Sequence, residues 1–157
     1  MSLLNEHLVR WITASVYKNF NEGEGSYDLL FEGVENKIGS NMSRAEIRIN
    51  GPNIEQISKG VWKISCDINV FIMSVISKVD LYAYQKMVGH FSELFPSSLP
   101  IYKLGNEGGD DMSLFTCLQS NSELKVTNFG IIGPDLNLQR GSLDMSYKSV
   151  EIEYGSD

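Results

Sequence analysis

The sequence has few cysteines, and they are not arranged to hold a metal ion or a framework of disulfides. Its two cysteines, Cys66 and Cys117, each lie inside an apolar run, and neither has a partner at metal-ligand spacing. We expect both thiols to be reduced and buried as small apolar side chains. The spacing does not exclude a disulfide between them, but nothing in the sequence indicates a secreted, oxidising setting.

Long apolar runs and clusters of basic residues are also missing. No apolar run approaches the length that spans a bilayer, so we expect no membrane segment. The first eleven residues include Glu6 and Arg10 and precede no small-residue cleavage site, which argues against a signal peptide. The 13 basic residues are scattered among 20 acidic ones, for a net charge of −7. Tight nucleic-acid binding is therefore not expected, although DNA could slide along such a surface without sticking.

The sequence contains none of the motifs that mark common catalytic centres. A nucleophile elbow, HExxH, paired CxxC and a Walker sequence are all absent. The two histidines, His7 and His90, fall in predicted helices, and His7 lies on the apolar face of its helix, which favours a packing role. We therefore expect no enzymatic activity, no catalytic residue, no metal and no cofactor.

One glycine-rich acidic segment, residues 105–111 (GNEGGDD), is the stretch of the sequence that most resembles a ligand-binding or catalytic loop. A phosphate site would need a basic residue and a helix N-terminus after the glycines, and neither is predicted here. Calcium could be bound by oxygen ligands from Asn106, Glu107, Asp110 and Asp111, although their spacing is not that of an EF-hand. Asp110 and Asp111 are a poor catalytic pair, because adjacent residues of an extended chain point to opposite sides. A solvated turn is the commoner outcome, and a small calcium-binding module stays an alternative.

What the sequence does contain is enough apolar material for one domain over residues 1–157, with 42% hydrophobic residues. Three-four spacing of apolar residues predicts helices over residues 3–20 and 79–95, the second ended by Pro96. The remaining patterns predict strands over residues 27–31, 101–104, 114–119, 123–132 and 141–154, with a bulge in the last one near 148–149. This order predicts an α+β domain, with two helices packed on one face of a mixed, mainly antiparallel sheet.

The most distinctive predicted element is a long hairpin over residues 44–76. Its first strand is interrupted at Gly51-Pro52, and after a turn at 58–60 the second strand alternates strictly from Trp62 onward. Sixteen extended residues would span roughly 53 Å, whereas a domain of this size is only about 35–40 Å across. Either the strand bends sharply or the hairpin tip projects. A projecting tip would offer a partner the residues Ile54, Ile57, Val61 and Trp62, although Trp62 by itself is more typical of a core residue.

Several of these segments resemble one family. The stretch RAEIRINGPNIEQISKGVWKISCDINVFI (44–72) resembles the long hairpin of small tail-completion and neck proteins of tailed bacteriophages. The phrases IYKLGNEGGDD (101–111), CLQ (117–119) and VTNFGIIGP (126–134) and the closing strand are also similar to such proteins. The resemblance covers about two-thirds of the chain, from Arg44 onward. It implies a tail terminator or a closely related head–tail joining protein.

The resemblance implies a mixed sheet with two helices and a ring, expected to be a homohexamer, that caps the finished tail tube and faces the head connector. The implied partners are further copies of the chain, the tail tube protein and the connector or adaptor proteins. The implied location is the virion neck, assembled in the bacterial cytoplasm. The family has no catalytic residues to carry over, and no motif marks its interfaces. We therefore take Ile54, Ile57, Val61 and Trp62, with Asp110 and Asp111, as the expected contact residues. Another neck, head-completion or baseplate role is the alternative within the same class.

Overall fold

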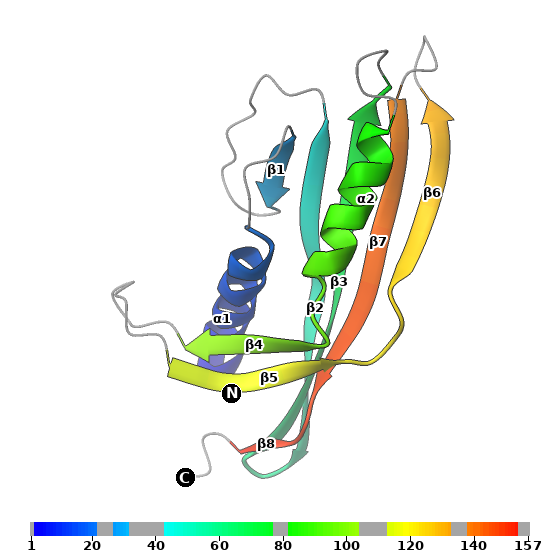
Figure 1. Cartoon of the computed structure of the whole chain (residues 1–157). Helices are drawn as coiled ribbons and strands as arrows, with labels where there is room; N and C mark the ends of the chain where they lie inside the picture. Colours follow the sequence, from blue (N-terminus) through cyan, green and yellow to red (C-terminus); the bar gives the residue numbers. More distant parts are fainter. Residues whose placement is uncertain are drawn as a thin grey trace.

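The structure, a computed structural model, describes residues 2–21, 27–31, 43–76, 82–103, 113–132 and 138–153, without the side chains of residues 2–6. Over these residues the chain forms two helices and eight strands in one curled sheet (Figure 1). The elements in chain order are α1 (Ser2–Phe20), β1 (Asp28–Phe31), β2 (Arg44–Ser58), β3 (Val61–Val75), α2 (Ala83–Leu94), β4 (Ser98–Lys103), β5 (Ser113–Ser120), β6 (Lys125–Ile132), β7 (Leu138–Ser149) and β8 (Ile152–Glu153).

The sheet is mixed but mainly antiparallel, as the sequence predicts. The strand order is β1-β2-β3-β7-β5-β4, with β6 beside the first half of β7 and β8 beside the start of β3. Only the β1–β2 pair is parallel among the described strands. The short pairing of β5 with the end of β7 turns the β4–β5 hairpin across the sheet, so β4 packs against α1 (Figure 1).

The first helix forms because its apolar residues recur every three or four positions. The buried members of this face are Leu8, Trp11, Ile12, Val16 and Phe20. Two polar side chains tie the helix to its neighbours. The Ser15 hydroxyl oxygen accepts a hydrogen bond from the Tyr102 amide of β4 at 3.0 Å, and the Asn19 amide nitrogen donates to the Leu94 carbonyl at the end of α2 at 2.9 Å.

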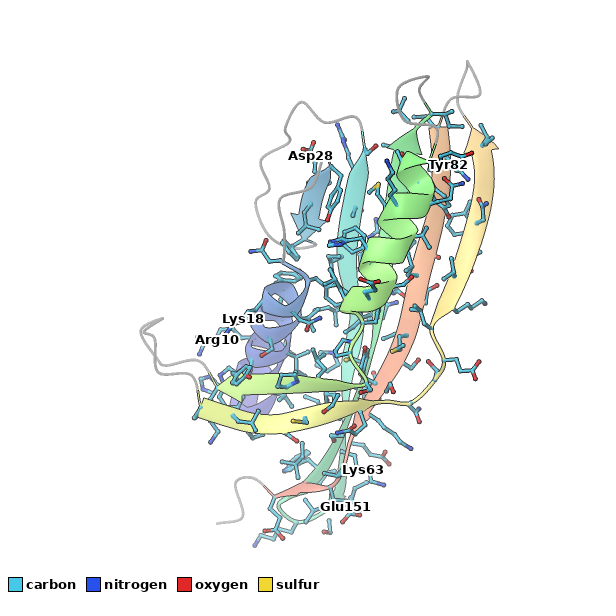
Figure 2. All side chains as sticks on the ribbon, viewed as in Figure 1. Arg10, Lys18, Asp28, Lys63, Tyr82 and Glu151 are labelled. Carbon is cyan, nitrogen blue, oxygen red and sulfur yellow. The ribbon has the colours of Figure 1, made fainter. Side chains whose placement is uncertain are left out.

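The second helix buries Tyr84, Met87 and Phe91 on the inner face of β3 and β7, and it ends at Leu94, two residues before Pro96. The start predicted at residue 79 lies outside the described residues. Both helices and the inner face of the sheet share one core (Figure 2), which confirms the predicted α+β architecture.

The long hairpin is confirmed and is built as the sequence indicates. In β3 the residues Ile64, Cys66 and Ile68 are buried while the residues between them are exposed. Its register with β2 shifts between Asn50 and Asn53, at the cis Gly51-Pro52 bond where Gly51 has a φ of 101°. The turn end extends past the β4–β5 hairpin (Figure 1).

The closing strand is split, because one extra residue interrupts its pairing with β3. The pair Ser65–Lys148 is followed by the pair Trp62–Ile152, so three steps along β3 match four steps along the partner. This irregularity confirms the bulge predicted near residues 148–149 and places β8 beside the hairpin tip.

Candidate functional site

The four contact residues predicted at the hairpin tip differ in how far their side chains are buried within the subunit. The Trp62 side chain is 6% exposed and belongs to the core, and Ile54 is half-buried against the same core. Ile57 is 43% exposed, and Val61 is half-buried. Within its own subunit, only Ile57 of these four offers a large apolar surface to a partner. Asp110 and Asp111 lie outside the described residues.

Several strand edges of the sheet lie open among the described strands, including those of β1 and β4 and, on different sides of the sheet, those of β6 and part of β2. Strand β6 pairs with β7 along one edge only, and residues 50–58 of β2 pair only with β3. The β6 edge exposes three large apolar side chains, Val126 (48%), Phe129 (50%) and Ile131 (50%). An exposed apolar edge strand readily pairs with another chain unless something covers it. We call Val126, Phe129 and Ile131 with the free backbone of β6 the β6 edge.

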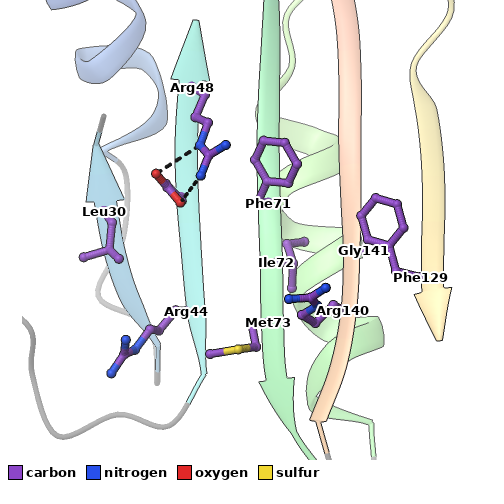
Figure 3. Close-up of a pocket in the computed structure, with 10 residues that line it drawn as sticks. Leu30, Arg44, Arg48, Phe71, Ile72, Met73, Phe129, Arg140 and Gly141 are labelled. Carbon is purple, nitrogen blue, oxygen red and sulfur yellow. Dashed lines mark hydrogen bonds and ion pairs between the residues drawn. The ribbon is translucent and has the colours of Figure 1, made fainter. Parts of the chain in front are cut away.

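A groove of about 440 Å³ lies on the outer face of the sheet, opposite α2 (Figure 3). We call it the arginine groove, because it contains three of the four arginines of the chain, Arg44, Arg48 and Arg140, and lacks only Arg10. Five strands contribute to it. The other lining residues are Leu30, Glu46, Phe71, Ile72, Met73, Phe129 and Gly141.

Strand register explains why these arginines share one face. Arg44 of β2 pairs with Met73 of β3, and Met73 pairs with Arg140 of β7. Directly paired residues point to the same side, so the two arginines flank Met73 with about 10 Å between their backbones, which is two strand spacings. In Figure 3 Arg140 extends from β7 towards β3, whereas Arg44 points towards the β1 side.

The charges of the groove are only partly compensated. The Glu46 carboxylate accepts two hydrogen bonds from the Arg48 guanidinium, at 3.0 and 3.1 Å, and this guanidinium lies 4.6 Å from the centroid of the Phe71 ring. No ion pair reaches Arg44 or Arg140 from the described residues, and the Arg44 Nε atom is buried without a hydrogen-bond partner there. Burying a polar group without a partner costs free energy, which favours an anionic occupant.

Other chemistry is sparse in the described part of the chain. No group of three or more metal-binding side chains occurs there, and the predicted calcium loop 105–111 lies outside it. His7 stacks on Trp11 with 5.7 Å between ring centroids, which confirms its packing role. Burial and the neighbouring Asp67 raise the pKa of the Cys66 thiol to about 12, which makes it a poor nucleophile. Neither described helix is long and apolar enough to cross a membrane.

The sequence analysis missed both the β6 edge and the arginine groove. Strand β6 itself was predicted. Its exposure depends on the position of α2, which packs mainly against β3 and β7 and not against β6. The bulge between Asn128 and Gly130 also resets the alternation of β6. The groove joins residues that are far apart in the sequence, so only the pairing of strands reveals it.

Comparison with known proteins supports the fold and no more. No known protein family matches the sequence, and no curated protein matches it. Eleven chains of solved structures are similar. One of them, a protein whose name states no function, superposes with a TM-score of 0.55 at 13% identity, covering 90% of this chain and 95% of its own.

Proposed function

We propose that this chain is a non-enzymatic structural subunit of a phage tail neck, and that copies of it form a ring, expected to be a hexamer. The ring terminates the tail tube and joins it to the head connector. The tail tube protein and the connector proteins are the further partners, and the site of action is the virion, after assembly in the host cytoplasm.

The observation that carries the proposal is the exposure of apolar side chains at two open strand edges that lie on different sides of the sheet. The β6 edge exposes Phe129 and Ile131 at one end, and residues 50–58 of β2 with Ile57 lie open at the other. Contact between two different surfaces of identical subunits repeats with each added copy, and it produces a ring where the rotation closes. The segments of the sequence that resemble tail-completion proteins support the same conclusion.

The charge of the chain suits such a ring. Each copy carries a net charge of −7, so the assembled ring would be strongly acidic. An acidic lumen repels the phosphates of DNA and lets the genome pass without binding. The absence of catalytic motifs from the sequence agrees with a structural role.

Light scattering during size-exclusion chromatography tests the proposal, together with an assay of tail-tube growth. We expect a homo-oligomer, and we expect the purified protein to block further growth of the tube. A chain that stays monomeric at high concentration and also fails to block growth would overturn it.

A different virion role remains the second candidate, because head-completion and baseplate subunits share the resemblance of segments. Electron microscopy of the particle separates these roles by the position of the ring. The calcium-binding alternative predicts that replacing Asp110 and Asp111 with alanine abolishes a calcium-dependent shift in melting temperature. If calcium does not shift the melting temperature of the wild-type protein, that alternative is removed.

A further inference from the structure

We propose that the last strand, β8, is exchanged between neighbouring copies of this chain, so that Ile152 of one copy packs against Trp62 of the next. The inference rests on the proposed ring, because it names one contact by which neighbouring subunits are joined. It adds a contact at the hairpin tip to the apolar contact at the β6 edge.

Strand β8 is attached to its own subunit by few contacts along β3. Among the described residues it pairs with β3 at two positions, Val61–Glu153 and Trp62–Ile152, whereas β7 pairs with β3 at eleven. Strand β3 begins at Val61, so the two pairs already extend to its end. A short terminal strand of this kind opens at a much lower free energy than the core of a sheet.

The place that β8 occupies is nevertheless part of the core. Ile152 is 9% exposed and Trp62 is 6% exposed, and both belong to the cluster of buried apolar residues. Opening β8 without a replacement would return this apolar surface to water, which is unfavourable. The vacated place on β3 therefore favours an apolar strand as its occupant.

The β8 strand of a second copy is the occupant that fits this place. It has the same sequence, so it reproduces the ladder pairs with Val61 and Trp62 and the packing of Ile152. Exchange of identical segments gives up no contact of the single subunit, and it is a low-cost route to oligomers. The balance between the closed and the exchanged form is therefore set by the residues that join β7 to β8.

We call Val150 and Glu151 the hinge, because they join β7 to β8 and belong to neither strand. Both are exposed, Val150 to 67%. The Ile64 amide donates a hydrogen bond to the Ser149 hydroxyl at 2.9 Å, so the chain is held up to the start of the hinge. A hollow of about 540 Å³ beside the hinge leaves space for a crossing chain. A neighbour at this position would also remove Val150 from water, which favours the exchanged form.

The length of the hinge sets how close two copies must be. Three extended steps from Ser149 to Ile152 span about 10 Å, which is two strand spacings. The hairpin tip extends past the β4–β5 hairpin (Figure 1), and Figure 2 shows Lys63 and Glu151 at this end, so a neighbour's tip can approach it. Mutual exchange between two copies closes a dimer, whereas exchange from each copy to the next continues until a ring closes.

A disulfide across the β3–β8 pair reports which chain supplies β8. Val61→Cys and Glu153→Cys place two thiols on paired residues, whose Cα atoms lie about 4.5–5.5 Å apart in an antiparallel pair, a separation that a disulfide bridges. A Cys117→Ser background leaves Cys66 as the one native thiol, and it is buried. After oxidation of the assembled protein, a denaturing gel without reductant should show covalently linked chains up to the size of the oligomer.

Oxidation of the same variant as a dilute monomer should close the bond within each chain. A chain locked in this way cannot give its β8 to a neighbour. We therefore expect its self-association to be at least about tenfold weaker than that of the reduced protein, and to recover when reductant is added. Glu55→Cys with Lys63→Cys in the same background is the matched control, because these exposed partners belong to one hairpin and link within one chain. The oxidised control should assemble like its reduced form.

Two single variants give an independent test, which also serves if the double variant does not fold. Val61→Cys and Glu153→Cys, each alone in the Cys117→Ser background, are mixed before assembly and then oxidised. Exchange should give a linked pair with one chain of each kind, identified by its mass. No single chain can form this bond.

The outcomes separate this inference from the proposed function. An oligomer whose oxidised chains all run as single chains overturns the exchange and leaves the ring standing. A locked chain that assembles as well as its reduced form also overturns the exchange. Linked pairs without larger species support the exchange and overturn the ring. A wild-type protein that neither assembles nor blocks tube growth, and whose variants form no linked chains, overturns both.

Discussion

The Tyr84 hydroxyl of α2 lies so close over the backbone of Gly141 in β7 that a β-carbon at Gly141 would overlap the hydroxyl oxygen. The same β-carbon would lie 2.7 Å from the Thr127 carbonyl oxygen of β6. The hydroxyl is buried without a hydrogen-bond partner among the described residues, and burial raises the pKa of Tyr84. The missing side chain at Gly141 is therefore what lets α2 approach the sheet.

Gly141→Ala should lower the free energy of unfolding by about 1–3 kcal/mol, because the added methyl group overpacks this contact. Urea unfolding followed by circular dichroism measures the change. Adding Tyr84→Phe should recover part of the loss, since it removes the hydroxyl oxygen but leaves the Thr127 carbonyl in place. Gly89→Ala is the control: no atom lies within 4 Å of its β-carbon, and in helix α2 it should stabilise by about 0.5–1 kcal/mol. Equal effects of the two alanines would contradict the steric account.

The sequence was sufficient to predict the features that depend on local periodicity. The helix over residues 3–20, the long hairpin with its bulge at Gly51-Pro52 and the split closing strand all follow from the spacing of apolar residues and the backbone limits of glycine and proline. Features that depend on which strands become neighbours were not predictable. Arg44 and Arg140 come together only because β3 lies between β2 and β7.

The burial of Trp62 was also not predictable from the sequence, because it too depends on strand pairing. Its place near a hairpin tip suggested a docking residue, while its place in an alternating apolar row suggested a core residue. The curl of the sheet and the pairing of β8 with β3 at Ile152 decide its surroundings, and the side chain is buried. Neither the curl nor that pairing leaves a signal in the local sequence.

Ile57→Asp should weaken assembly while changing the free energy of unfolding by no more than about 0.5 kcal/mol, because this side chain is exposed at the hairpin end. Trp62→Ala should instead destabilise the subunit by about 3–5 kcal/mol, because it opens a cavity in the core. Chemical unfolding and light scattering, run on both variants, separate the two effects. An Ile57→Asp subunit that assembles normally would remove the hairpin end from the interface.

Ile131→Lys should weaken self-association strongly, because it places a charge on the apolar β6 edge that the proposed neighbour covers. Its stability should change little, since the side chain is half exposed. Val9→Lys is the control, because Val9 is similarly exposed (42%) and lies on helix α1, in neither of the two proposed contact edges. If sedimentation shows both variants assembling alike, the β6 edge is not a subunit contact.

The two thiols should react at different rates with a thiol reagent at about pH 8. Cys66 is buried, and burial together with Asp67 raises its pKa to about 12, so almost none of it is thiolate at that pH. Cys117 is half-buried and should react first. A spectrophotometric assay with Ellman's reagent should show one early thiol, which Cys117→Ser removes, and a second thiol only after unfolding. Fast labelling of Cys66 in the folded protein would show that the core around β3 opens readily.

Stability should also fall as the pH rises above about 9, because two buried acids keep their protons in the folded chain. The Cys66 thiol has a pKa of about 12 when folded against its ordinary 9.0, and burial likewise raises the pKa of the Tyr147 phenol above its ordinary 10.0. Between the unfolded and folded pKa values the unfolded chain binds fewer protons. The free energy of unfolding then decreases with pH by up to about 1.4 kcal/mol per pH unit for each group.

Variants at these two residues check that assignment. Cys66→Ala should flatten the decline between about pH 9 and 12, and Tyr147→Phe should flatten it only above about pH 10. Tyr147→Phe also loses the hydrogen bond that its hydroxyl donates to the Pro96 carbonyl at 2.8 Å, so at neutral pH it should be less stable by about 0.5–1.5 kcal/mol. Urea unfolding at several pH values separates the constant loss from the change in slope. If neither variant alters the slope, other groups cause the alkaline decline, and the protons of this core play no part in it.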